Sequence, residues 1–189
     1  MNSGASQDFL RQTGATVPLI CGPMYPCSNP ELVAAVSAAG GIGVVQPISL
    51  TYVHGHEYRE GLRLIGALAG GRPIGFNALV EKSSRTYEQR MIRWVDIALE
   101  EGVRFFITSL GNPRWVVDKV HAAGGIVYHD VINRRWGEKA RDEGVDQTRG
   151  GGFDAAVEGK WAADDGEPHR FATTRSISGN SSRRAAWKL

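Results

Sequence analysis

The chain has 189 residues, of which 42% are hydrophobic and 22% charged, as in an ordinary globular domain. Its formal net charge of +2 is too small to indicate nucleic-acid or membrane-surface binding, and no apolar run approaches the roughly 20 residues that cross a bilayer. No basic region followed by an apolar one marks a secretory signal at the start, so a cytoplasmic protein is expected.

Short apolar runs alternate with helical patterns along most of the chain. The five runs that read as strands are residues 18–22, 42–47, 73–80, 103–110 and 125–131. Each is followed by a segment with helical spacing or capping residues. This alternation is typical of parallel β-α-β units, so an α/β fold with a single parallel sheet is expected.

The segments between the strands carry helix signals. Asn29 is a candidate N-cap with Pro30 at the first helical position, and Gly40 and Gly41 end that helix. A second segment spaces its apolar residues at helical intervals: Tyr58, Leu62, Ile65 and Leu68. The strongest apolar stripe is formed by Met91, Trp94, Val95 and Leu99, and it is predicted to be buried against the strands at 73–80 and 103–110.

The pattern changes after Asp146. Residues 147–189 show no alternation and no sustained helical stripe, and their apolar residues are mostly alanine. Such a segment buries too little apolar surface to offset its ordering entropy. We therefore expect a domain at residues 1–146 and a low-order tail at residues 147–189. A disrupted reading frame would produce such a loss of pattern.

Cys21 and Cys27 are the only cysteines, and neither a disulfide nor a metal site is expected from them. Their C-x5-C spacing lacks the second pair of a zinc site and differs from the redox C-x-x-C spacing. His54 and His56 lie in a loop without an evident third ligand. The glycines at 40–43 close a helix and open a strand, the reverse of a dinucleotide-binding fingerprint.

Polar residues recur at the carboxyl ends of the apolar strands. They are Gln46, Asn77, Thr108, Ser109, His129 and Asp130. In a barrel of β-α units the carboxyl ends of the strands carry the active site. The recurrence therefore favours a pocket for a polar ligand or a catalytic centre at that end.

Several of these stretches together resemble one enzyme family. The sequences PLICGPMYPCSNPELVAAVSAAGGIGVVQP, PIGFNALVEKS, FFITSLGNP and AGGIVYHDV resemble the nitronate monooxygenases, also called 2-nitropropane dioxygenases, over roughly residues 15–146. That resemblance implies an FMN-dependent (β/α)8 barrel that oxidises alkyl nitronates with molecular oxygen. With five strands found, the expected fold is a partial TIM barrel of about five βα units.

The resemblance also implies cofactor contacts. Gly22, Pro23 and Met24 fall on the turn whose backbone contacts the flavin ring in the family. Glycine permits close approach, proline fixes the chain direction, and methionine offers an apolar surface to an aromatic ring. The two cysteines that flank this turn are then bystanders.

The resemblance implies that three further residues contact the cofactor. Asn77 matches the family asparagine that contacts the flavin. Gln46 and His129 lie at strand ends where additional cofactor contacts are expected.

The chain also departs from the family. The histidine of a motif resembling GGHAG after the sixth strand is the family's base, and no such motif occurs here, so no catalytic residue is assigned. The family's flavin phosphate site lies late in the barrel, in strands not found in this chain. Two alternatives stay open: an enoyl-acyl-carrier-protein-reductase-like flavin enzyme, and a non-catalytic fragment that pairs its open sheet edge with another chain.

Overall fold

The computed structural model describes residues 4–81 and 84–150. The described elements, in chain order, are α1 (Gly4–Thr13), β1 (Ile20–Cys21), α2 (Pro30–Ala38), β2 (Ile42–Val45), η1 (Ser49–Val53), α3 (Tyr58–Leu68), β3 (Gly75–Leu79), α4 (Arg85–Glu100), β4 (Phe105–Ser109), α5 (Arg114–Ala122), β5 (Ile126–Val131), α6 (Arg134–Asp142) and β6 (Gln147–Gly150). The expected alternation of strand and helix is confirmed.

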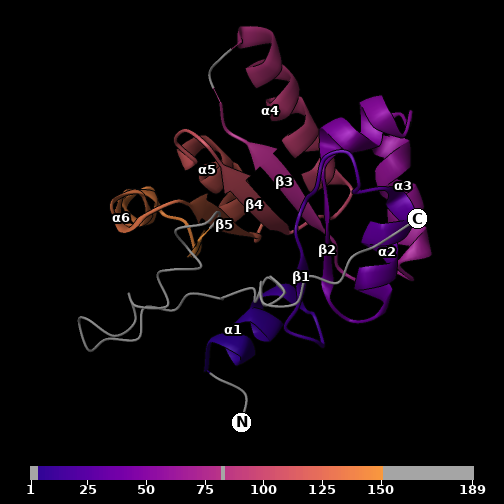
Figure 1. The fold of residues 1–189 in the computed structure, drawn as a ribbon, viewed down its shortest axis with the longest axis horizontal. Helices are drawn as coiled ribbons and strands as arrows, with labels where there is room; N and C mark the ends of the chain where they lie inside the picture. Colours follow the sequence, from indigo (N-terminus) through magenta and orange to yellow (C-terminus); the bar gives the residue numbers. More distant parts are fainter. Residues whose placement is uncertain (1–3, 82–83, 151–189) are drawn as a thin grey trace, which may run out of the picture.

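The strands form one parallel sheet in sequence order, from β1 to β6. Each strand pairs with the next. Across β3, β4 and β5 the pairing is continuous, with successive residues of one strand opposite successive residues of its neighbour. Helices α2 to α6 lie along one side of this sheet, whereas α1 lies apart from them near β1 (Figure 1). The sheet curls into part of a barrel, so the predicted partial (β/α) barrel is confirmed, with six strands in place of about five.

The expectation that regular structure ends after Asp146 is wrong by one strand. Residues 147–150 pair with β5 through Tyr128↔Gln147 and His129↔Thr148. A parallel strand at the end of a sheet needs only its backbone N–H and C=O groups, so the polar sequence QTRG forms it without an apolar pattern. The rest of the predicted tail, residues 151–189, lies outside the described residues.

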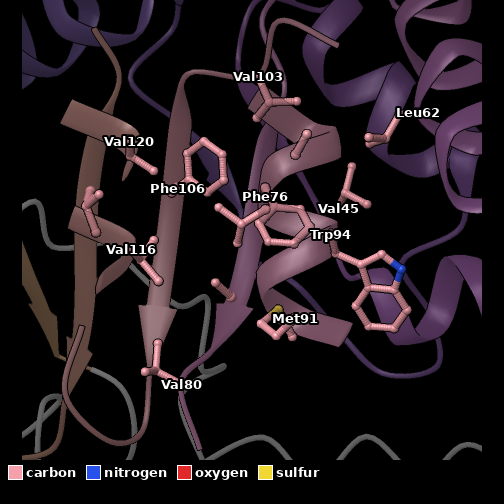
Figure 2. Close-up of a cluster of buried hydrophobic side chains, with 14 of the residues drawn as sticks. Val45, Leu62, Phe76, Val80, Met91, Trp94, Val103, Phe106, Val116 and Val120 are labelled. Atoms are coloured by element: carbon pink, nitrogen blue, oxygen red, sulfur yellow. The ribbon is translucent and has the colours of Figure 1, made fainter. Parts of the chain in front are cut away.

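The larger core lies between the sheet and its helices. Phe76 and Phe106, with ring centroids 5.4 Å apart, pack against Met91, Trp94 and Val95 of α4 (Figure 2). These five side chains are buried, as the apolar stripe predicted. Two members of the predicted stripes differ, because they lie at the margins of their helices.

The first is Leu99, which was expected to be buried with the rest of the stripe. It packs against the core but is only partly buried, since it is the second-last residue of α4. The second is Leu68, the last residue of α3, which is 50% exposed. Helical spacing alone does not reveal where along a helix the contact with the sheet ends.

A smaller core fills the opposite, concave face of the sheet. Ile42, Val44, Phe105, Ile107 and Tyr128 contribute to it from the strands. The sequence interpretation did not assign α1, yet this helix supplies Phe9, whose ring packs edge-on against Phe105 at 6.2 Å. Gln12 of α1 accepts a hydrogen bond from the Tyr128 hydroxyl at 3.1 Å. Helix α1 therefore covers part of the concave face.

Local signals set the ends of α2 as predicted. Asn29 Oδ1 accepts a hydrogen bond from the N–H of Leu32 at 2.7 Å, and Pro30 is the first helical residue. Gly40 has φ of 96°, which suits glycine in the turn that follows the helix. These caps orient α2 so that it packs directly on β2.

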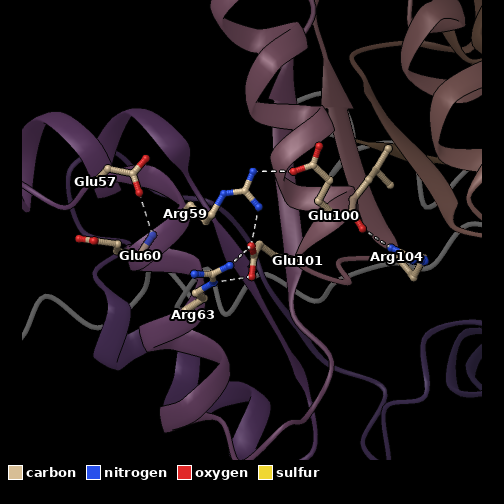
Figure 3. Close-up of polar contacts among 8 residues, drawn as sticks. Glu57, Arg59, Glu60, Arg63, Glu100, Glu101 and Arg104 are labelled. Carbon is tan, nitrogen blue, oxygen red and sulfur yellow. Dashed lines mark hydrogen bonds and ion pairs between the residues drawn. The ribbon is translucent and has the colours of Figure 1, made fainter.

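An ion-pair network joins α3 to the end of α4 (Figure 3). Arg59 and Arg63 of α3 both donate to Glu101, at 2.6 Å and 2.9 Å, and Arg59 also pairs with Glu100. The hydrogen bonds from Arg63 and Arg59 lower the pKa of Glu101. The network fixes the two helices relative to each other on the side opposite the carboxyl ends of the strands.

Candidate functional site

The two faces of the sheet are distinguished by the alternation of side chains along each strand. Phe76, Ala78, Phe106 and Val127 belong to the core under the helices. The intervening residues of the same strands therefore point to the concave face, where the smaller core lies. This alternation decides which of the predicted site residues can meet.

Gly22, Pro23 and Met24 follow β1 directly. The turn is held by Ser28, whose Oγ accepts from the N–H of Met24 at 2.8 Å and whose own N–H donates to the Met24 carbonyl at 2.8 Å. A Cβ added at Gly22 would meet nothing within 4 Å. The backbone is thus open to the close approach of a ligand, and Met24 is 44% exposed beside it.

Gln46 follows β2 and is only 5% exposed. Its Oε1 accepts a hydrogen bond from the N–H of Ser49 at 2.9 Å, at the start of η1. Because that contact needs the amide oxygen, it fixes the orientation of the side chain and leaves the NH2 group facing elsewhere. The Gln46 side chain is therefore oriented so that its NH2 group can donate a hydrogen bond to a ligand.

Asn77 lies in the middle of β3 on the concave face and is 5% exposed. The pairing of Val45 with Phe76, continued by one residue, sets Gln46 opposite Asn77 on the neighbouring strand. Within residues 4–81 and 84–150, no hydrogen bond to the Asn77 amide is present, and its nitrogen and oxygen are not among the fully buried atoms that lack a partner. The amide is therefore available to a ligand that can bond to it.

His129 does not join these residues. It pairs with Thr108 in register, and both follow the alternation of Phe106 and Val127 toward the helix-covered face. Thr108 Oγ1 lies 2.7 Å from Nδ1 of His129, and the two side chains are buried. The structure therefore sets Gln46 beside Asn77, with Gly22 at the end of the neighbouring strand β1, and places His129 on the other side of the sheet.

A strained turn at the end of β4 was not anticipated from the sequence. Leu110 has φ of 62°, a left-handed conformation that is rare for leucine, and its side chain is 55% exposed. A Cβ at Gly111 would lie 1.9 Å from the carbonyl oxygen of Val80, so this turn requires glycine. Strained backbone of this kind clusters at functional sites. Gly111 was the only sequence signal of it.

The other candidates give no sign of metal chemistry. Cys21 and Cys27 carry free thiols, and burial raises the pKa of the Cys21 thiol. His54 Nε2 contacts the Pro26 carbonyl at 3.0 Å. In the part of the chain that the structure describes, no group of three or more His, Cys, Asp or Glu is placed to hold a metal ion. No helix in that part is long and apolar enough to cross a membrane.

Comparison with known proteins supports the fold and identifies a family. The family model described as "Nitronate monooxygenase" matches residues 8–133. The chain is also similar to the (3aS,4S,5R,7aS)-5-hydroxy-7a-methyl-1-oxo-octahydro-1H-indene-4-carboxyl-CoA dehydrogenase of Rhodococcus jostii (strain RHA1), with 24% identity over 133 residues. That match covers 70% of this chain and 35% of the dehydrogenase, so the chain spans about a third of its curated relative.

Two solved structures share the architecture. FabK from Thermotoga maritima superposes with a TM-score of 0.58 and 21% identity, over 76% of this chain and 43% of FabK. A nitroalkane oxidase from Streptomyces ansochromogenes superposes with a TM-score of 0.60 and 20% identity, over 79% of this chain and 49% of the oxidase. At these identities the likeness extends to the fold alone.

Proposed function

The chain belongs to the nitronate monooxygenase family, and from this membership we propose that the concave face of its sheet is a flavin-binding surface of an oxidoreductase barrel. The observation that carries the proposal is the pair of neighbouring amides, Gln46 and Asn77. The Asn77 amide makes no hydrogen bond with the described residues, and Gln46 is oriented as a donor by its bond from Ser49. A flavin ring edge offers alternating donors and acceptors that such a pair can bind.

The residues present fit the flavin ring. Gly22 leaves open space above its backbone, and Met24 supplies an exposed apolar side chain next to it. Gly22, Met24, Gln46 and Asn77 would hold the ring, with Pro23 fixing the direction of the turn. When bound, FMN would supply the electron transfer, and the protein would supply binding and orientation.

The family-level reaction that we propose is the oxidation of an alkyl nitronate by molecular oxygen. A second candidate is an oxidoreductase acting on a thioester with a nicotinamide donor, as in the enoyl-reductase alternative. It is favoured by the match over 133 residues to a relative named as a carboxyl-CoA dehydrogenase. The two candidates differ in whether nitronate consumption or NAD(P)H oxidation accompanies turnover.

We further propose that this 189-residue chain is impaired in both activities. It contains no sequence resembling GGHAG, and no residue is assigned as the base that takes the substrate proton. General base catalysis typically contributes about 10²–10⁴-fold. The ring contacts lie at β1, β2 and β3, whereas barrel phosphate sites commonly follow strands seven and eight. A ring held without its phosphate binds weakly, because the phosphate is a strong charged anchor.

The proposal is tested by comparing FMN with riboflavin, which has the same ring and no phosphate. Purified chain is titrated with each by equilibrium dialysis, and nitronate consumption and NAD(P)H oxidation are assayed separately. We expect weak binding of equal strength for the two flavins and no turnover. Absence of binding by either flavin would refute the flavin-binding face. Much tighter, stoichiometric FMN with nitronate turnover would refute the impairment.

A further inference from the structure

The guanidinium of Arg90, in the second turn of α4, is surrounded by aromatic rings. Its central carbon lies 5.4 Å from the ring centroid of Tyr52, 5.8 Å from that of Tyr87 and 5.5 Å from that of Trp94. One of its terminal nitrogens also donates to the Tyr52 hydroxyl. Ring faces attract a cation, but they accept no strong hydrogen bond.

Arg90 has no anionic partner within residues 4–81 and 84–150. None of the ion pairs in that part includes Arg90. Its Nε is buried and makes no hydrogen bond. A buried donor attached to a charged group is costly to leave unpaired, so the site lacks an acceptor.

The groups around Arg90 include further donors, together with one carboxylate near Tyr87. The hydroxyl of Tyr87 is buried without a partner in the described residues, as is that of Thr51, the residue before Tyr52 in η1. Burial and the nearby Glu81 carboxylate raise the pKa of Tyr87 to about 12, so this phenol keeps its proton at neutral pH. Residues 85–93, at the N-terminal end of α4, contain three arginines and one glutamate. The N-terminal end of a helix favours negative charge.

We propose that Arg90 is the centre of an oxyanion site, which takes a phosphate or a carboxylate group. An oxyanion accepts several hydrogen bonds and donates none when ionised, so it complements a guanidinium and a phenol that lack acceptors. In this structure the Tyr52 hydroxyl, and not an oxyanion, accepts the hydrogen bond from the guanidinium. Its side chain is 60% exposed on η1, a single turn of π-helix, an element often found at functional sites. Rotation of the ring into solvent opens the site.

The site is separate from the flavin-binding surface and does not rest on that proposal. Helix η1 follows β2 and α4 follows β3, so the Arg90 site lies on the same carboxyl-end side of the sheet. It lies in the helical layer, however, since Trp94 belongs to the core under the helices. A ligand bound here contacts α4 and η1 and leaves the concave face free.

The test is calorimetric titration of the full chain with inorganic phosphate and, separately, with acetate, at constant ionic strength maintained with chloride. The key variant is Arg90→Gln, and the matched control is Arg93→Gln. Arg93 is exposed on the same helix, so its replacement removes the same charge without touching the aromatic rings. A third variant, Tyr52→Phe, removes the hydroxyl that competes for the guanidinium and changes an exposed side chain only.

We expect saturable binding of one or both anions, weakened roughly tenfold or more by Arg90→Gln, since hydrogen bonds to a charged group are lost. Arg93→Gln should leave the affinity within about twofold, and Tyr52→Phe should strengthen it. The anion whose binding saturates at the lower concentration, phosphate or acetate, identifies whether the site prefers a phosphate or a carboxylate group. No saturable binding of either anion overturns the site, as does equal weakening by the two arginine variants. If Arg90→Gln does not fold, unchanged affinity in Tyr52→Phe overturns it.

Discussion

Thr108 Oγ1 lies 2.7 Å from Nδ1 of His129, across β4 and β5, and both side chains are buried under the helices. Thr108 also donates its only hydroxyl proton to the carbonyl of Tyr128 at 3.2 Å. The short contact therefore requires His129 to donate from Nδ1, which fixes the neutral tautomer with its lone pair on Nε2. His129 is thus held as a structural group.

The first prediction concerns acid stability. Burial lowers the pKa of His129, against a smaller opposing effect of Asp130. Since the folded pKa lies below the unfolded value of about 6.5, this contribution to stability is complete above that pH and is lost as the pH falls through it. Chemical denaturation at several pH values should show a smaller loss of unfolding free energy below pH ~6.5 in His129→Gln than in wild type. His56→Gln is the control, and an unchanged pH dependence in His129→Gln contradicts the prediction.

The second prediction concerns the helix-covered core. Met91 is 1% exposed and Leu99 is only partly buried, although both lie on the apolar stripe of α4. Met91→Ala should lower the free energy of unfolding by about 2–5 kcal/mol, because it leaves a cavity. Leu99→Ala should cost less, since less of its surface leaves water on folding. If urea denaturation shows equal losses of unfolding free energy in the two variants, the predicted effect of side-chain exposure is contradicted.

The third prediction compares a glycine at an α/β contact, Gly43, with an open helical glycine, Gly66. A Cβ at Gly43 would lie 2.0 Å from the carbonyl oxygen of Val33, so β2 and α2 must separate in Gly43→Ala. A Cβ at Gly66, inside α3, would meet nothing within 4 Å. Thermal unfolding should show a clear loss of stability for Gly43→Ala and a gain of up to about 1 kcal/mol for Gly66→Ala. A neutral Gly43→Ala would mean that α2 does not press on β2 as described.

The fourth prediction separates ligand binding from folding at Asn77. Its side chain is 5% exposed and its amide makes no hydrogen bond within the described residues, so an apolar residue of similar size should not destabilise the fold. Asn77→Leu should retain or raise the unfolding free energy while weakening riboflavin binding about two- to tenfold, the worth of a neutral hydrogen bond. Loss of stability together with unchanged flavin affinity would mark Asn77 as structural.

The fifth prediction concerns the open sheet. Strands β1 and β6 lie at its two edges, and each pairs with one neighbour in the described sheet. We propose that these edges pair with another copy of the chain, because an unpaired edge offers free N–H and C=O groups. Sedimentation velocity over a range of concentrations should show reversible association. A monomer at every concentration would be the contrary result.

Much of the fold could be read from the sequence, because its signals are local. The apolar runs and their β-branched residues marked β1 to β5, and Asn29 with Pro30 marked the start of α2. The resemblance to nitronate monooxygenases agreed with the matched family over most of its range. Helix α1 was missed, since its place depends on the concave face that only the assembled sheet creates.

Tertiary structure decided which candidate residues can act together. Neighbouring residues of a strand point to opposite faces, so His129 turns away from the face of Asn77, although the sequence placed both near strand ends. The register between β2 and β3 set Gln46 opposite Asn77. The register of the strands, and the face to which each side chain points, are fixed by packing between segments that are distant in the chain. A local sequence pattern therefore does not reveal them. For the same reason β6 formed from a polar sequence: its partner was the backbone of β5.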